Sequence, residues 1–79
     1  MIKAQILSPE SSRTVEAQAV FLPGSLCPFE VLPGHAPIIS SLDAGAVRWR
    51  TPEGGEESLE IKGGVVRLEK DVMQICVEL

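Results

Sequence analysis

The chain has 79 residues and a formal net charge of −4, with 44% hydrophobic and 23% charged residues. This size allows one hydrophobic core, so residues 1–79 are expected to form a single domain. The acidic balance argues against binding to nucleic acid or directly to anionic lipid, because both usually need a basic face. No apolar run approaches the roughly 20 residues of a membrane span, so any membrane association is expected to run through other subunits.

The first third of the chain predicts two strands. Residues from Ile2 to Ile6 alternate between apolar and polar, which is the period of a half-buried strand. A turn-forming cluster follows at Ser8–Ser12. The odd-numbered residues of Val15–Phe21 then place apolar side chains on one face of a second strand, which Pro23-Gly24 ends.

An irregular segment separates these strands from the rest of the chain. Its prolines, Pro28, Pro33 and Pro37, exclude a helix between Ser25 and Pro37. Because loops held on a rigid scaffold commonly carry binding surfaces, the stretch from Gly24 to Pro37 is the first candidate for a binding site.

The middle of the chain continues as short strands. Ile38-Ile39 begins a short apolar segment, and Val47 and Trp49 alternate with arginines in the next strand, which places Trp49 in the core. Thr51–Gly55 is typical of a hairpin connection.

The C-terminal part predicts two more strands joined by a tight turn. Gly63-Gly64 indicates a bend or bulge before Val65–Leu68. Lys70-Asp71 is a plausible two-residue turn into Val72–Val77, which is apolar at nearly every position, as expected of a strand covered on both faces. The fold class is therefore all-β, a small β-sandwich or flattened barrel.

Hydrolytic chemistry is not supported by the only histidine. Ser40, Ser41 and Asp43 follow His35 closely, but a catalytic triad needs an activated serine, an orienting carboxylate and an oxyanion hole. There is no GxSxG-like elbow. A polar residue in a surface turn is the better interpretation of His35.

Metal and cofactor binding are likewise not expected. Cys27, His35 and Cys76 lack the paired spacing of structural zinc ligands. Cys76 is predicted to be a small buried residue within an apolar strand, whereas Cys27 beside Pro28 is expected to be exposed. The glycine pairs lack the Lys-Ser/Thr of a phosphate-binding loop.

Three stretches of the chain resemble one protein family. They are Ile6–Glu10, the run from Val20 through Leu32-Pro33-Gly34-His35-Ala36-Pro37 to Ile39, and Gly45–Arg48 with the later Ile61–Val66. Their order and spacing are similar to those of the N-terminal domain of the epsilon subunit of F-type ATP synthases. The Leu-Pro-Gly-His-Ala-Pro run is the most specific element, and the resemblance covers essentially the whole chain.

This resemblance implies a sandwich of about ten short strands and a non-catalytic function. The chain would be a rotor subunit of the central stalk, a peripheral protein at the cytoplasmic face of the bacterial inner membrane. It would link the gamma subunit to the c-ring and help couple ion-driven rotation to ATP synthesis, and it is expected to be a monomer when isolated. The loop Ser25–Glu30 would face the c-ring, through Leu26, Cys27, Pro28 and Glu30, while Ser8 and His35 would lie near gamma.

Two departures from the family pattern accompany the resemblance. Leu26-Cys27-Pro28 stands where the family loop often has acidic and glycine residues, and Glu30 is hypothesised to supply the missing charge. Typical members also continue into a C-terminal helical hairpin. The given chain ends at Leu79, so this hairpin is expected to be absent, and inhibition of hydrolysis through such helices is not expected. The alternative function is a free-standing β-sandwich that binds carbohydrate or peptide, for which the chain has few aromatic side chains.

Overall fold

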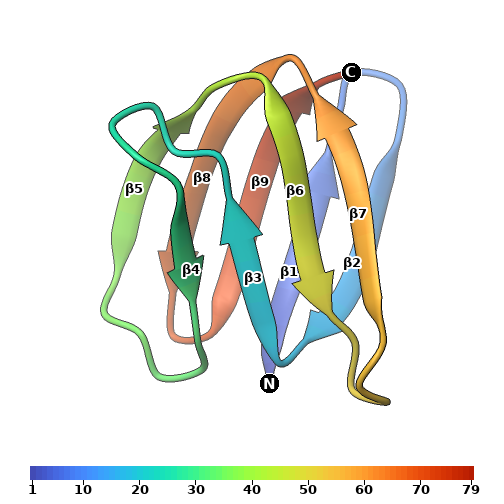
Figure 1. Ribbon diagram of the computed structural model, residues 1–79, viewed down its shortest axis with the longest axis vertical. Helices are drawn as coiled ribbons and strands as arrows, with labels where there is room; N and C mark the ends of the chain where they lie inside the picture. The colour runs from blue at the N-terminus through green and yellow to red at the C-terminus, as the bar shows by residue number, and fades with distance from the viewer.

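The computed structural model describes residues 1–79 and contains nine strands and no helix (Figure 1). The strands are β1 (Ile2–Leu7), β2 (Ser12–Ala17), β3 (Ala19–Leu22), β4 (Phe29–Val31), β5 (Ile38–Leu42), β6 (Gly45–Arg50), β7 (Glu56–Ile61), β8 (Gly63–Glu69) and β9 (Val72–Glu78). The expected all-β class is confirmed.

Two sheets pack face to face to form a β-sandwich (Figure 1). The first, called sheet A here, has five strands in the order β2-β1-β9-β8-β5, and sheet B has four in the order β4-β3-β6-β7. All neighbouring strands are antiparallel except β1 and β9, which run parallel in the middle of sheet A. The first and last strands therefore hold each other at the centre of the sheet.

The hydrophobic core lies between the sheets and forms one cluster of 16 buried residues. Ile2, Ala4 and Ile6 are buried as their alternation predicted, and Trp49 is only 2% exposed. Fully burying one large aliphatic side chain contributes about 1.5–3 kcal/mol, which makes this cluster the main source of stability. No polar or charged residue is buried with it.

One edge of the sandwich is closed by Arg13 from β2. Its guanidinium lies over the Trp49 ring, 5.4 Å from the ring centroid, and donates a 2.8 Å hydrogen bond to Glu57 on β7. Because β2 belongs to sheet A and β7 to sheet B, this side chain joins the two sheets where their edge strands meet.

The predicted single strand over Val15–Phe21 is wrong, because the chain changes sheets at Gln18. The backbone N–H of Gln18 donates to the Arg50 carbonyl at 2.9 Å, and its side-chain amide donates to the Pro52 carbonyl at 2.9 Å. The alternation shifts by one residue there. Val20 is buried, and Phe21 lies on the outer side of sheet B instead of in the core.

The prediction that the last strand is covered on both faces is also wrong. β9 alternates strictly between exposed and buried residues, with Met73, Ile75 and Val77 facing the core. Cys76 points to the outer side and is exposed, which contradicts its expected burial. Nothing in this chain covers the outer side of sheet A, so apolar residues there remain in solvent.

The predicted connections are confirmed. Lys70-Asp71 joins β8 to β9 with both residues at positive φ, 50° and 61°. The Thr51–Gly55 hairpin closes with a hydrogen bond from the Thr51 N–H to the Gly55 carbonyl at 2.8 Å. The bend expected near Gly63 falls at Lys62, where the chain passes from sheet B to sheet A.

Candidate docking face

Several apolar side chains lie among polar ones on the outer side of sheet A. Val65 on β8 lies opposite Cys76 on β9, which in turn lies beside Leu7 on β1, so the three share one face of the sheet. Ile39 on β5 lies on the same face, one side-chain row further along. These four residues, Leu7, Ile39, Val65 and Cys76, are called the apolar band below.

Two residues of the apolar band are largely open to solvent. Ile39 is 75% exposed and Val65 is 48% exposed. A shallow hollow of about 450 Å³ lies at the Leu7 end of the band, lined by Leu7, Ser8, Pro9, Gly64, Val65, Cys76, Val77 and Glu78. A Cβ on Gly64 would overlap the Cys76 carbonyl oxygen, so the absence of a side chain there is required for β8 and β9 to pair. Exposed apolar patches of this kind typically mark interaction surfaces.

Ser8 lies at one end of the apolar band, directly after Leu7. It begins the tight turn between β1 and β2, in which its N–H donates to the Ser11 carbonyl at 2.9 Å. The two hydroxyls, Ser8 Oγ and Ser11 Oγ, are 3.0 Å apart. The turn holds Ser8 at the rim of the hollow, where a partner on sheet A would meet it.

His35 lies at the opposite end of the sandwich, in the loop that leads into β5 (Figure 1). The His35 N–H donates to the Leu32 carbonyl at 3.2 Å, and Gly34 between them has φ of 85°. Pro33 followed by a glycine at positive φ is the sequence of a type II turn. The ring Nδ1 donates to the Ala36 carbonyl at 2.7 Å, which leaves Nε2 without a hydrogen bond inside the chain.

Ser8 and His35 therefore do not lie together, but the apolar band runs between them. Ile39 follows His35 by four residues along the chain, and Leu7 immediately precedes Ser8. A partner that contacts both polar residues has to span the length of the sandwich, and the outer side of sheet A offers an apolar path for it. Sequence reasoning missed all four band residues. The doublets Ile38-Ile39 and Val65-Val66 carried the signal, because adjacent strand residues face opposite sides.

The loop Ser25–Pro28 projects from the same end of the sandwich as Ser8 (Figure 1). Leu26 at its tip is fully exposed, and Cys27 is exposed as expected. The base of the loop is fixed by Ser25, whose hydroxyl donates to Asp43 Oδ1 at 2.9 Å and accepts from the Ser41 hydroxyl at 2.9 Å. The loop thus holds an apolar side chain away from the domain on a braced base.

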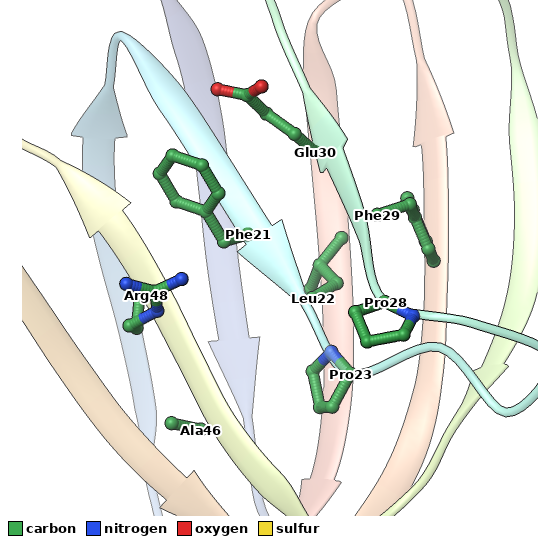
Figure 2. A pocket seen from close by; sticks show the side chains of 8 residues that line it. All are labelled: Phe21, Leu22, Pro23, Pro28, Phe29, Glu30, Ala46 and Arg48. Atoms are coloured by element: carbon green, nitrogen blue, oxygen red, sulfur yellow. The ribbon is translucent and has the colours of Figure 1, made fainter.

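Glu30 does not belong to this loop, although it was expected to act with it. It lies on β4, opposite Phe21 on β3, and faces the outer side of sheet B. Figure 2 shows it beside a hollow of about 420 Å³, lined by Phe21, Leu22, Pro23, Pro28, Phe29, Glu30, Ala46 and Arg48. Pro28 is the residue that the loop and this hollow have in common.

The outer side of sheet B is occupied by pairs of its own side chains. The guanidinium of Arg48 lies over the Phe21 ring, 4.9 Å from its centroid, and is 3.3 Å from Glu56 Oε1. Phe21 is therefore partly covered by a neighbouring strand, and the charge of Arg48 has a partner. No large hydrophobic side chain on this side is exposed to the extent seen on sheet A.

The structure does not assemble the polar residues into a reaction centre. The Asp43 carboxylate accepts from Ser25, and the only side-chain hydrogen bond of His35 is to Ala36. No group of three histidine, cysteine, aspartate or glutamate residues is placed to hold a metal ion. The structure also has no helix with the length and apolar character needed to cross a membrane.

The fold and the face together define a small β-sandwich with exposed apolar side chains on one outer side. The family model described as the β-sandwich domain of the ATP synthase delta/epsilon chain matches residues 1–79. The chain belongs to this family. Epsilon chains are non-catalytic subunits of ATP synthase, which confirms the expectation that this chain is not itself an enzyme.

Two curated relatives are both ATP synthase epsilon chains. That of Bordetella petrii is 33% identical over 63 residues, which are 80% of this chain and 45% of the relative. That of Psychrobacter cryohalolentis is 40% identical over 48 residues, which are 61% of this chain and 35% of the relative. The matched part of the chain thus spans less than half the length of these relatives.

Two solved structures share the fold. A chain in the mitochondrial ATP synthase of Euglena gracilis, in a structure of OSCP, F1 and the c-ring, superposes with a TM-score of 0.90 at 18% identity, over 96% of this chain and 49% of that chain. A chain in the central stalk and c-ring structure of the Tetrahymena thermophila mitochondrial enzyme gives 0.83 at 10% identity, over 99% and 63%. At these identities the comparison shows the fold alone.

Proposed function

We propose that this chain is a rotor subunit of the ATP synthase central stalk, linking the gamma subunit to the c-ring and helping couple ion-driven rotation to ATP synthesis. The observation that carries the proposal is the apolar band on the outer side of sheet A. The two solved structures described above come from assemblies that contain a c-ring. The protein would sit peripherally at the cytoplasmic face of the bacterial inner membrane.

Gamma is proposed to lie along the outer side of sheet A, from His35 to Ser8. This placement lets one partner cover Ile39 and Val65 and reach the free Nε2 of His35 and the Ser8 hydroxyl at the two ends. Protein interfaces combine apolar and polar side chains, and this face offers both, because Gln5, Arg67 and Gln74 lie among its apolar residues.

The c-ring is proposed to meet the loop Ser25–Pro28, at the end of the sandwich that also carries Ser8, through Leu26, Cys27 and Pro28. An apolar tip on a loop braced by Ser25 and Asp43 is suited to contact a second partner while gamma occupies sheet A. Glu30 would contribute a charge from β4, close to Pro28 in the hollow of Figure 2, instead of from the loop itself.

The proposal is tested first by mixing the purified chain with the gamma subunit of the same organism and measuring association by calorimetry and gel filtration. Tight one-to-one binding, weakened by His35→Ala, is expected, with the isolated chain eluting as a monomer. Absence of binding at micromolar concentrations would contradict the rotor function while leaving the fold unaffected.

Attachment to the ring is tested separately in the assembled enzyme. Leu26→Ser and Glu30→Ala are each expected to weaken coupled proton or sodium pumping without lowering the Tm of the isolated chain, since neither side chain is in the core. Adding the chain is expected to leave ATP hydrolysis without the strong inhibition that helices would exert. A strong switching effect on hydrolysis would contradict that part of the proposal.

A further inference from the structure

The loop that carries His35 is tied to a distant turn by one carboxylate. The N–H of Gly34 donates to Asp71 Oδ1 at 2.7 Å, between residues 37 positions apart in the chain. Gly34 belongs to the loop between β4 and β5, and Asp71 to the two-residue turn between β8 and β9. In Figure 1 both segments lie at the same end of the sandwich.

The hydrogen bond satisfies a group that the loop cannot satisfy by itself. In the turn Leu32–His35, the closing bond runs from the His35 N–H to the Leu32 carbonyl, so the N–H of Gly34 has no partner within the turn. The Asp71 carboxylate supplies that partner, and a charged acceptor makes the bond stronger than one to a neutral group. Gly34, immediately before His35, is thereby fixed to the body of sheet A.

Lys70 and Asp71 are energetically unfavourable residues for the turn that they form. Both have positive φ, 50° and 61°, which is the region that two-residue hairpin turns require and that glycine adopts most easily. A glycine at position 71 would fit the turn better but could not accept a hydrogen bond from Gly34. The carbonyl of Asp71 also accepts from the Lys3 N–H at 2.8 Å, a backbone contact that any residue would make.

We propose that Asp71 is a positioning residue for partner binding: its carboxylate holds the loop Leu32–Pro37 in the conformation that presents His35 at the end of the sandwich where β5 begins. This inference rests on the proposed docking of gamma along sheet A. Asp71 touches His35 only through Gly34, so its effect on binding is indirect and comes from the order of the loop.

Three variants separate the positioning role from the turn itself. Asp71→Gly removes the carboxylate and keeps a residue suited to positive φ. Asp71→Asn keeps an acceptor oxygen and a side chain that tolerates the turn. Lys70→Gly relieves the same turn at the neighbouring position while leaving the carboxylate in place, and it is the matched control. All three are expected to retain or slightly raise the Tm.

The first measurement is amide hydrogen exchange at Gly34 and His35 by NMR in the isolated chain. Asp71→Gly is expected to speed exchange at Gly34 by about tenfold or more, because a hydrogen bond to a charged group is lost. Asp71→Asn and Lys70→Gly should stay within about threefold of the parent chain. Unchanged protection of Gly34 in Asp71→Gly would overturn the inference.

The second measurement is calorimetric affinity for the purified gamma subunit. Asp71→Gly is expected to weaken binding by about 3- to 10-fold, an indirect loss smaller than that of a direct contact, with the other two variants close to the parent chain. If Asp71→Gly releases Gly34 but binds gamma as tightly as the parent, the positioning role is wrong. If the parent chain does not bind gamma at all, the docking proposal fails, and the exchange data still decide whether Asp71 orders the loop.

Discussion

The two outer sides of this sandwich are both formed by short strands. They differ in how far neighbouring side chains cover the apolar side chains that face solvent. On sheet B, Arg48 covers the Phe21 ring and is paired with Glu56, so three of its outward side chains are in contact through Arg48. On sheet A, Ile39 and Val65 have no such cover and remain in solvent. The contrast favours sheet A over sheet B as the side that the proposed partner covers.

The largest expected effect comes from placing a charge in the centre of the apolar band. Val65→Glu should weaken gamma binding by at least about 30-fold, because the carboxylate would be buried without a partner. Calorimetry against gamma measures the change. The isolated chain should still fold, because Val65 is half exposed and its inner neighbour Val66 is untouched.

The matched control for this substitution lies on the other sheet. Ser58 on β7 faces outward opposite Arg48, so Ser58→Glu adds the same charge next to an existing cation. Its affinity for gamma should stay within about twofold of the parent. Equal losses of affinity for gamma in Val65→Glu and Ser58→Glu would show that gamma binding does not distinguish the outer sides of the two sheets.

A moderate effect is expected at the edge of the band. Ile39→Ser should weaken gamma binding by about 3- to 10-fold, since it removes apolar area that the partner would bury. Val72→Ser is the control within the same sheet, because Val72 is 43% exposed but lies in a row with Lys3 and Glu69, outside the band. If both serine variants bind gamma equally well, the surface that gamma covers is not centred on the apolar band.

The smallest expected effect concerns the outer side of sheet B. Arg48→Ala should lower the free energy of unfolding by no more than about 1 kcal/mol, because the ion pair and the ring contact are both at the surface. Urea denaturation measures the loss. Affinity for gamma should not change, and a marked loss of affinity would place the interface on sheet B.

Most of the fold could be predicted from the sequence because the strands are short and bounded by turn residues. The alternation at Ile2–Ile6 and around Trp49 identifies the core, and Lys70-Asp71 and Thr51–Gly55 are correctly predicted as turns. The change of sheet at Gln18 could not be predicted. It depends on hydrogen bonds from Gln18 to the carbonyls of Arg50 and Pro52. These residues are distant from Gln18 in the chain and come close to it only in the folded structure.

The candidate face was harder to find than the fold. The apolar residues of Val72–Val77 predicted a strand covered on both sides, whereas only one face of β9 is buried. Cys76 was therefore placed in the core, whereas it lies on the exposed side. The hydrogen bond between Gly34 and Asp71 joins residues 37 positions apart in the chain, and no local sequence pattern predicts such a contact.

The two native cysteines allow the central claim to be tested without any substitution. Both thiols are exposed, Cys76 within the apolar band and Cys27 on the loop proposed to face the ring. The measurement is the rate of maleimide labelling at each cysteine, followed by mass spectrometry, for the isolated chain and for its complex with gamma. Docking along sheet A predicts that gamma protects Cys76 strongly and leaves Cys27 reactive. Undiminished labelling of Cys76 in a saturated complex would contradict the account.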